Sequence, residues 1–542
     1  MRWRLLLYAF LSGILFILAW PVKGFPFLLF IAFVPLLLIQ HQISIDNRLR
    51  ARHLFLYSYI AFLVWNVGTT WWVAHIHFGQ EAAFLAFLEH SLLMAFVFLV
   101  FHKVKRALPE RFGTFAIIPI WISFEYLHLD WDLTWPWLTL GNGFASWNET
   151  IQWYEYTGVF GGSFWILLLN VLIFDLYIYR NTLLRPLRRR TIYIVCTSCI
   201  LILPLIWSLL IYSTIDPYEG DESISVVVIQ PNIDPYSKFG GEFREQTEKM
   251  LALAESKIDT AVDYVLLPET ALVESFWEND MQYSWSIKRL TTYRSHYPKL
   301  AIVTGAATGR FFDDGVKPSL TARKFKHEPG WYDNYNTAIQ IDTTHEISVY
   351  HKSKLVPGSE KLPFPKYFQY LEVFALDLGG TKGSLGVQEE RTVFYHPTSK
   401  SRIAPVICYE SIYGEYVSEY IANGARFIFI MTNDGWWDDT PGYRQHLAYG
   451  TLRAIETRKS IARSANTGIS CFINIRGEIQ QPQAWATTTA IKQRIVSTSA
   501  LTFYTKHGDY IGVAMLWISW AAVGWFFVRL LLLKIKKRQQ LS

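Results

Sequence analysis

Long apolar runs alternate with short basic segments over the first part of the chain. A helix needs about 20 apolar residues to cross the roughly 30 Å hydrocarbon core of a bilayer. Runs of this kind recur up to Tyr212, and one more lies near the C-terminus. The predicted spans are Leu5–Trp20, Phe25–Gln40, Leu54–His75, Ala83–Phe101, Thr114–Leu127, Gly158–Tyr179, Ile192–Tyr212 and Ile511–Leu533.

Lys and Arg residues gather on alternate sides of these spans. They precede the first span and follow the second, fourth, sixth and last, whereas the loops at 75–82 and 128–157 contain neither. Because cytoplasmic loops collect Lys and Arg, the alternation predicts eight spans with both ends of the chain in the cytoplasm. The segment between Tyr212 and Ile511 is then expected on the outer side of the membrane.

The composition agrees with a membrane protein and excludes several other classes. Of 542 residues, 51% are hydrophobic and only 18% are charged, against roughly 25% in a typical soluble domain. The net charge of +6 comes from basic clusters beside the spans, which indicates topology signals and contacts with anionic lipid rather than a nucleic-acid surface. Four cysteines make no disulfide framework.

Beyond about Ile215 the pattern changes to short apolar runs separated by stretches of helical periodicity. Strands alternating with helices of roughly 10–15 residues indicate βαβ units, here with some antiparallel pairs. The predicted strands are Ser225–Gln230, Tyr264–Leu267, Ala301–Gly305, Thr337–Asp342, Ile347–His351, Ile403–Tyr409, Phe427–Met431 and Ile469–Ile475. The predicted helices are Glu242–Ile258, Ser284–Ser295, Tyr413–Gly424 and Tyr443–Lys459.

Three ionisable residues follow or end predicted strands, where active groups gather in an open α/β sheet. They are Glu269, Lys352 and Cys408. A thiolate is a strong nucleophile, a carboxylate can take the thiol proton, and an ammonium can stabilise both the thiolate and a developing oxyanion. The three groups together would suffice for acyl transfer through a thioester.

Each of these residues also has an ordinary structural explanation. A lone Cys at a strand end is usually a small core residue, a Glu after Pro is often a turn residue, and a loop Lys is usually solvated. Only their joint placement at three strand ends favours catalysis. The sequence shows neither a clustered Cys/His metal motif nor a phosphate-binding glycine loop, so we expect no metal and no cofactor.

The motifs of this region resemble those of the nitrilase, or carbon–nitrogen hydrolase, superfamily. With eight spans added, the whole chain resembles the apolipoprotein N-acyltransferase family of bacterial lipoprotein maturation. The resemblance covers essentially the full length. Its most specific segments are Ile229–Ile233, Leu267–Thr270, Lys352–Pro357, Cys408–Glu410, Thr432–Trp436, Gln445–His446, Arg453–Glu456 and Arg463–Gly468.

The resemblance implies an α-β-β-α sandwich and a role for each site residue. Glu269 would be the base, Lys352 the stabiliser of the oxyanion and thiolate, and Cys408 the nucleophile. It further implies an essential second glutamate at Glu360, followed by supporting roles for the residues after the cysteine and for an aromatic of the early loop. These last residues are Tyr409, Glu410 and Phe239.

Two positions depart from the family pattern. The family usually reads Val-Pro-Phe-Gly-Glu where this chain reads Val356-Pro357-Gly358-Ser359-Glu360, so the loop carrying Glu360 is expected to have a different shape. Phe239 stands where the family commonly has tryptophan. The apolar side chains within 357–370, among them Leu362, Phe364, Tyr367 and Phe368, favour a lid that excludes water over an ordinary Pro/Gly loop.

The implied reaction is ping-pong transfer of an acyl chain from a phospholipid to the α-amine of a diacylglyceryl-modified apolipoprotein. The implied setting is the bacterial inner membrane, with the catalytic domain on the periplasmic side, and we expect a monomer. The predicted domains are residues 1–214 (seven spans), 215–508 (catalytic) and 509–542 (last span and basic tail).

Two other functions use the same features. A membrane-anchored amidase would need the same three residues but no lipid-sized pocket, and release of lysophospholipid would distinguish the two enzymes. A transporter or structural membrane protein with a degenerate nitrilase-like domain is disfavoured by the intact Glu269, Lys352 and Cys408.

Overall fold

The computed structural model describes residues 2–76, 80–182, 184–315, 317–344, 346–362, 364 and 384–540. These residues form two compact units, which are described separately. One unit comprises the described residues of Met1–Ala74, Gln80–Ser213 and Asp509–Ser542. The other comprises those of Thr214–Gly508 with the short stretch His75–Gly79.

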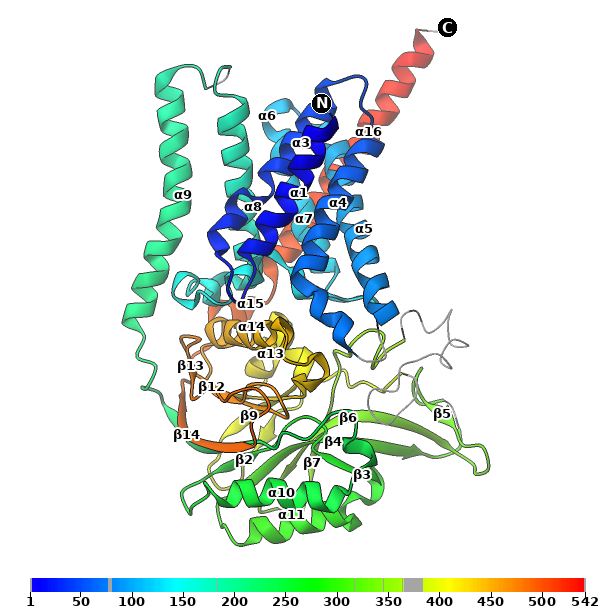
Figure 1. Cartoon of the computed structure of the whole chain (residues 1–542), viewed down its shortest axis with the longest axis vertical. Coiled ribbons are helices and arrows are strands. Elements are labelled where there is room, and N and C mark those ends of the chain that lie inside the picture. The colour runs from blue at the N-terminus through cyan, green and yellow to red at the C-terminus, as the bar shows by residue number, and fades with distance from the viewer. Residues whose placement is uncertain are drawn as a thin grey trace. The chain divides into compact units, whose positions relative to one another are not determined.

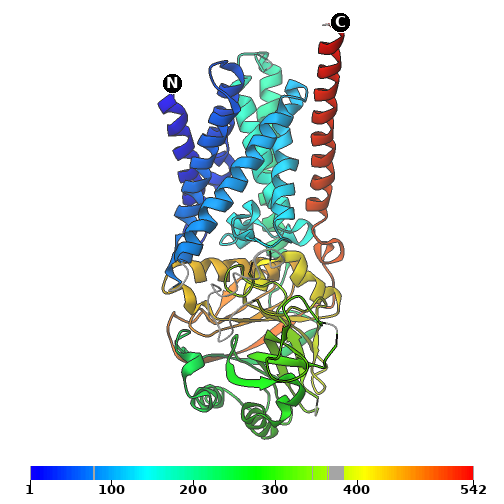
Figure 2. The same cartoon turned by 90° about the vertical axis from the view of Figure 1, so that its right-hand side faces the viewer.

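The first unit is a bundle of apolar helices that run side by side (Figure 1, Figure 2). Its helices are α1 (Arg2–Ala19), η1 (Pro26–Leu28), α2 (Leu29–Ala32), α3 (Val34–Ile45), α4 (Ala51–Thr70), α5 (Gln80–Lys105), α6 (Glu110–Gly113), α7 (Ile117–Leu127), α8 (Tyr154–Ile178), α9 (Leu187–Thr214) and α16 (Tyr510–Gln539).

Six helical segments of the described chain are long and apolar enough to cross a membrane. Two of the eight predicted spans fall outside this set. Helix α4 has 20 residues but carries Arg52 and His53 in its first turn and contains Asn66. The apolar segment Thr114–Leu127 is shorter than the others. The structure therefore supports a polytopic helical membrane domain, while the number of eight spans stays a prediction.

The second span is interrupted between η1, α2 and α3, and a side chain of α8 satisfies the exposed main chain there. Asn170 donates from Nδ2 to the carbonyl of Leu29 (2.7 Å) and accepts at Oδ1 from the N–H of Phe33 (2.8 Å). Hydrocarbon offers no hydrogen-bonding partner, so a broken helix persists in a membrane only where protein supplies one.

The second unit contains two stacked β-sheets among its described residues. One sheet has the order β14-β1-β2-β4-β6-β5, with β3 beside β4 and β7 beside β6, and the other has the order β13-β12-β11-β10-β9-β8. The strands are β1 (Glu222–Gln230), β2 (Tyr264–Leu266), β3 (Leu272–Trp277), β4 (Ala301–Phe312), β5 (Arg323–Lys324), β6 (Trp331–Ile341), β7 (Ser348–His351), β8 (Phe394–Tyr395), β9 (Arg402–Ile407), β10 (Phe427–Thr432), β11 (Ile461–Ala465), β12 (Cys471–Ile473), β13 (Ile479–Gln480) and β14 (Thr489–Ser497).

Helices cover the outer face of each sheet. Figure 1 shows α10 (Phe243–Glu255) and α11 (Trp285–Ser295) along the first sheet, and α13 (Gly414–Ala422) and α14 (Pro441–Thr457) along the second. The short helix α15 (Phe503–His507) ends the unit. The order of layers is α-β-β-α, which confirms the predicted sandwich.

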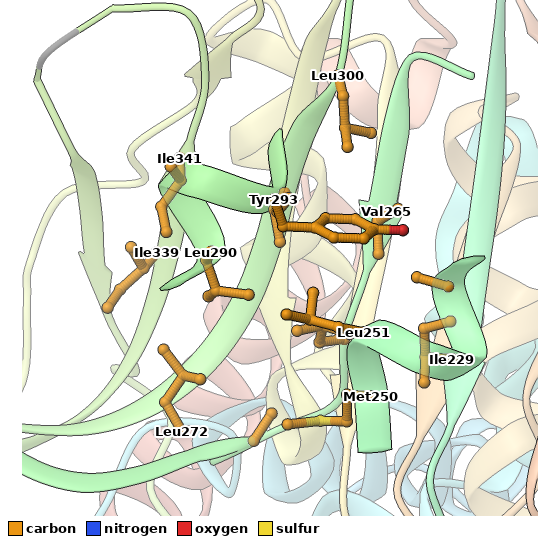
Figure 3. Packing of buried hydrophobic residues seen from close by; sticks show 14 of the residues in the cluster. Ile229, Met250, Leu251, Val265, Leu272, Leu290, Tyr293, Leu300, Ile339 and Ile341 are labelled. Atoms are coloured by element: carbon orange, nitrogen blue, oxygen red, sulfur yellow. The ribbon is translucent and has the colours of Figure 1, made fainter. Parts of the chain in front are cut away.

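Parallel strands covered on both faces explain the continuous apolar runs of the sequence. The six residues of β10 are all buried. On the outer face of the first sheet, Ile229 and Val265 pack against Leu251 of α10 and Leu290 of α11 (Figure 3). Between the sheets, the ring of Tyr264 meets that of Phe429 edge-on at 5.0 Å.

The sequence patterns gave most strands but not all of them. Strands β3, β5, β8, β11, β13 and β14 were not predicted, and β14 pairs with β1 along all nine of its residues. The sequence of β14 mixes apolar and charged residues, so only its place beside β1 makes it a strand. The structure also corrects the end of the predicted strand Ile403–Tyr409, because β9 stops at Ile407.

Candidate active site

Glu269 is held by a close approach of two main-chain segments just beyond β2. The N–H of Gly305 in β4 donates to the carbonyl of Pro268 (3.1 Å). A Cβ at residue 305 would lie 2.5 Å from the backbone nitrogen of Thr270, so only glycine permits this contact. Thr270 itself has a positive φ of 46°, which turns the chain sharply after the glutamate.

Lys352 is the first residue after β7 and lies between two carboxylates. Its Nζ donates to Oε1 of Glu269 (3.0 Å) and to Oε1 of Glu360 (2.8 Å), and the residue is only 1% exposed. Asn336 of β6 strengthens the group, since its Nδ2 donates to the same two oxygens at 2.8 and 3.0 Å. The structure therefore brings Glu269, Lys352 and Glu360 into one buried cluster.

The altered loop before Glu360 forms a tight turn. Gly358 adopts a positive φ of 84°, and the Glu360 N–H donates to the carbonyl of Val356 (3.0 Å). The Glu360 side chain folds back so that its Oε2 accepts from the N–H of Val356 (2.9 Å). The Gly-Ser sequence thus still directs this carboxylate to Lys352.

Cys408 follows β9 directly and begins the turn η10 (Cys408–Ile412). Its φ of 49° is uncommon for a residue other than glycine. The side chain is 8% exposed, and its Sγ lies 3.3 Å from the hydroxyl of Thr432 at the end of β10. The carboxylate of Glu269 and the ammonium of Lys352 both act electrostatically on the thiol.

The charges of the cluster set its resting protonation. Burial alone would raise the pKa of Glu269, but the Lys352 ammonium and the hydrogen bonds from Lys352 and Asn336 hold it below the ordinary value. Burial raises the pKa of the Cys408 thiol, the Glu269 carboxylate raises it further, and Lys352 offsets only part of this. The resting site therefore pairs a neutral thiol with an ionised carboxylate, the arrangement that a general base requires.

Glu410 connects the turn that carries Cys408 to the turn that carries Lys352. Its carboxylate accepts from the hydroxyls of Tyr350 and Tyr416 (both 2.6 Å), from the N–H of Ser353 (2.7 Å) and from the N–H of Ile407 (2.8 Å). Ser353 follows Lys352 and Ile407 precedes Cys408. A single buried carboxylate thus fixes the distance between the two turns.

We expect Glu410→Gln to destabilise this unit by about 3 kcal/mol, because an amide NH₂ would replace one oxygen facing donors and the charge would be lost. Thermal unfolding of the purified protein measures the effect. Glu245→Gln, at an exposed position of α10, is the matched control and should unfold like the wild type. Equal melting temperatures for the two variants would contradict this role of Glu410.

The remaining predicted residues lie nearby or outside the described chain. Tyr409 is buried with its ring 5.4 Å from that of Tyr413, and the ring of Phe239 lies 5.3 Å from Nζ of Lys238. Of the proposed lid, the structure describes residues 357–362 and Phe364. Tyr367 and Phe368 lie outside the described residues.

A buried polar network behind Cys408 was not predicted from the sequence. His446 contacts the Cys408 carbonyl through Nε2 (3.1 Å) and Asp434 through Nδ1 (2.9 Å), and Arg463 donates to Asp434 (2.6 Å). The motifs Thr432–Trp436, Gln445–His446 and Arg463–Gly468 contain Asp434, His446 and Arg463, but their contact depends on the pairing of β10 with β11 and on the position of α14. Among the residues that the structure describes, no group of three or more His, Cys, Asp or Glu could hold a metal ion.

Two family models match the chain. Residues 12–172 match the apolipoprotein N-acyltransferase N-terminal domain, and residues 226–501 match carbon-nitrogen hydrolase. The chain is 30% identical over 518 residues to the apolipoprotein N-acyltransferase of Chlorobaculum tepidum, with 92% of each chain covered. It is 26% identical to that of Geobacter metallireducens, with 93% of this chain and 91% of the relative covered.

Solved structures of lower similarity match about half of this chain. An amidase from Nesterenkonia sp. is 13% identical, with a TM-score of 0.35, over 52% of this chain and 94% of the amidase. The nitrilase-superfamily protein Nit3 of Saccharomyces cerevisiae is 14% identical, with a TM-score of 0.34, over 52% of this chain and 92% of Nit3.

Proposed function

The chain belongs to the apolipoprotein N-acyltransferase family, and from this premise we propose how its residues perform acyl transfer. It is a membrane-bound acyltransferase of the carbon–nitrogen hydrolase superfamily that acts on lipoproteins. The observation that carries our assignment of the site is the buried cluster in which Lys352 lies between Glu269 and Glu360.

The first half-reaction forms a thioester. Glu269 takes the proton of the Cys408 thiol as the sulfur attacks the ester carbonyl of a phospholipid. The oxyanion that develops is stabilised by the Lys352 ammonium. The ester C–O bond then breaks, Glu269 returns the proton to the departing oxygen, and a lysophospholipid leaves.

The second half-reaction forms the amide. The α-amine of a diacylglyceryl-modified apolipoprotein attacks the thioester carbonyl, and Glu269 accepts a proton from the amine. The C–S bond breaks, and Glu269 passes this proton to the departing sulfur, which restores the thiol. Exclusion of water protects the thioester between the two steps, which is the role we assign to the segment 357–370.

Glu360 orients the Lys352 ammonium in both half-reactions. Its Oε1 accepts from Lys352 at 2.8 Å and from Asn336 at 3.0 Å. The site is supported by Tyr409, Glu410 and Phe239. Glu410 sets the spacing of the turns that carry Lys352 and Cys408, and Phe239 lies on the loop that borders Glu269. No cofactor enters this mechanism.

We expect Glu360→Gln to slow acyl-enzyme formation by about 10–100-fold, the equivalent of losing a hydrogen bond to a charged group. Single-turnover release of lysophospholipid measures the rate. Glu346→Gln, at the exposed turn before β7, is the control. A wild-type rate for Glu360→Gln would contradict its assigned role.

We further propose the setting and the division of the chain. Residues 215–508 form the catalytic domain on the periplasmic side of the bacterial inner membrane, residues 1–214 and 509–542 anchor it, and the enzyme acts as a monomer. The helices that are long and apolar enough to cross a membrane support an enzyme whose two substrates both carry acyl chains. A membrane-anchored amidase is not favoured, because the curated relatives are N-acyltransferases over nearly the whole length.

The purified protein, given phosphatidylethanolamine and a peptide with an N-terminal diacylglyceryl-cysteine, should release lysophospholipid and convert the peptide to its N-acyl form. Mass spectrometry of the peptide reads the added acyl mass. Release of free fatty acid with an unchanged peptide would instead indicate a hydrolase.

A further inference from the structure

Lys238 is a buried lysine beside the candidate base that the mechanism above does not use. It begins the short turn η7 (Lys238–Gly240) and is 3% exposed. Its main chain is fixed on both sides, because its N–H donates to the carbonyl of Asp234 (3.1 Å) and its carbonyl accepts from Nε2 of Gln246 (2.8 Å). A lysine is seldom buried unless its charge has a function or a partner.

The ammonium of Lys238 is directed at the segment that carries Glu269. Its Nζ donates to the hydroxyl of Thr270 (2.5 Å) and lies 3.4 Å from the carbonyl oxygen of Glu269. Thr270 is the residue with the positive φ that turns the chain after the base. The lysine therefore bridges the loop after β1 to a strained turn whose position sets that of the Glu269 carboxylate.

The charge of Lys238 completes the balance of the cluster. Glu269 and Glu360 share one ammonium, that of Lys352. Within the described chain no carboxylate oxygen lies within 4.0 Å of the Lys238 ammonium, yet it acts electrostatically on Glu269 and favours its ionised form. With Lys238 included, the site holds two ammoniums and two carboxylates.

We propose that Lys238 is a second lysine of this active site, a positioning residue that fixes the Glu269–Thr270 turn and keeps the Glu269 carboxylate ionised. The inference rests on the proposed function of Glu269 as the base. Burial lowers the pKa of Lys238 to about 8, with Glu269 opposing the shift, so the side chain is mainly charged at neutral pH.

The sign of the pH effect follows from the groups that face Glu269. These are Lys352 after β7, Glu360 in the next turn, Cys408 at the start of η10, Lys238, and the uncharged donors Asn336 and the Asn433 N–H. Removing one nearby cation disfavours the carboxylate and raises the pKa of Glu269. The pH at which the rate of the first half-reaction falls to half on the acid side must then be higher.

The test measures single-turnover release of lysophospholipid from phosphatidylethanolamine in detergent micelles between about pH 3 and 8, a range that extends well below the ordinary pKa of a glutamate. No acceptor peptide is present, so its amine does not contribute to the profile. Lys238→Gln keeps a donor for Thr270 but removes the charge, and Lys238→Met removes both. We expect the acid midpoint to rise by about one pH unit in each variant, as loss of a neighbouring charge predicts.

Three controls separate charge from structure. Lys238→Arg keeps the charge and should keep the wild-type midpoint, although its rate falls. Thr270→Val removes the hydroxyl acceptor and should lower the rate without moving the midpoint. Lys249→Met, on the exposed side of α10, should match the wild type in both.

An unmoved midpoint in Lys238→Gln overturns the inference, whatever its rate, because a purely structural or donor-binding lysine would behave in that way. This result would leave the proposed function standing. Lysophospholipid release by a Cys408→Ala variant would instead overturn the proposed function itself.

Discussion

Replacing Cys408 by alanine is expected to abolish acyl transfer, with a loss of roughly 10³-fold or more in the rate of lysophospholipid release. The sulfur is the only atom of the site that we assign a bond to the acyl group. Because the side chain is small and already buried, the variant should fold, and thermal unfolding should show a change of only about 1 kcal/mol.

The matched control is Cys196→Ala, at an exposed cysteine of α9. It should transfer acyl groups at the wild-type rate. Full activity of Cys408→Ala would show that another group forms the covalent bond, or that none does, and would refute the proposed mechanism.

Replacing Lys352 by methionine is expected to have the second largest effect, and to affect both activity and stability. The carboxylates of Glu269 and Glu360 would remain buried, both bound to Asn336 but without the ammonium between them. Leaving buried charges unpaired costs about 3–5 kcal/mol, and loss of the oxyanion stabiliser costs about 10²–10³-fold in rate. Thermal unfolding and single-turnover kinetics measure the two effects.

A double variant separates the effect on stability from the effect on activity. Lys352→Met combined with Glu360→Gln removes one of the two unpaired carboxylates, so it should regain part of the stability but none of the activity. Lys257→Met, at an exposed position after α10, is the control and should lose at most about 1 kcal/mol. A Lys352→Met variant as stable and as active as this control would contradict the cluster.

The α/β character of the catalytic domain could be predicted because its central strands are covered on both faces, whereas the sandwich was implied only by the family resemblance. Most of β10 and residues 226–229 of β1 therefore appear in the sequence as unbroken apolar runs. Strand β14 could not be predicted in this way, since Lys492, Gln493 and Arg494 interrupt its apolar residues. Its conformation is set by pairing with β1, which lies about 260 residues away in the sequence.

The same limit applies to the site. Glu269, Lys352 and Cys408 follow strands, and the general placement of active groups at strand ends was enough to select them. Asn336 lies inside β6, where the only sequence signal is that asparagine is depleted in strands. Lys238 lies in a loop, where a buried lysine cannot be distinguished from a solvated one until the fold shows what it faces.

The spans illustrate a different limit. Apolar length identified six segments that the structure also makes long helices. Helix α4 forms with Asn66 buried, its Oδ1 2.8 Å from Nδ1 of His90 in α5. Polar groups that pair between helices lower the hydropathy of a segment without preventing it from packing in a bundle, so length and hydropathy alone leave the span count open.

The central claim is that Cys408 carries the acyl group between two substrates. Intact-protein and peptide mass spectrometry of enzyme incubated with phosphatidylethanolamine tests it directly. The account predicts one added acyl mass, located on the peptide that contains Cys408 and lost when the diacylglyceryl peptide is added. An enzyme that converts the acceptor while Cys408 never carries an acyl group, or an acyl group found on another residue, would contradict it.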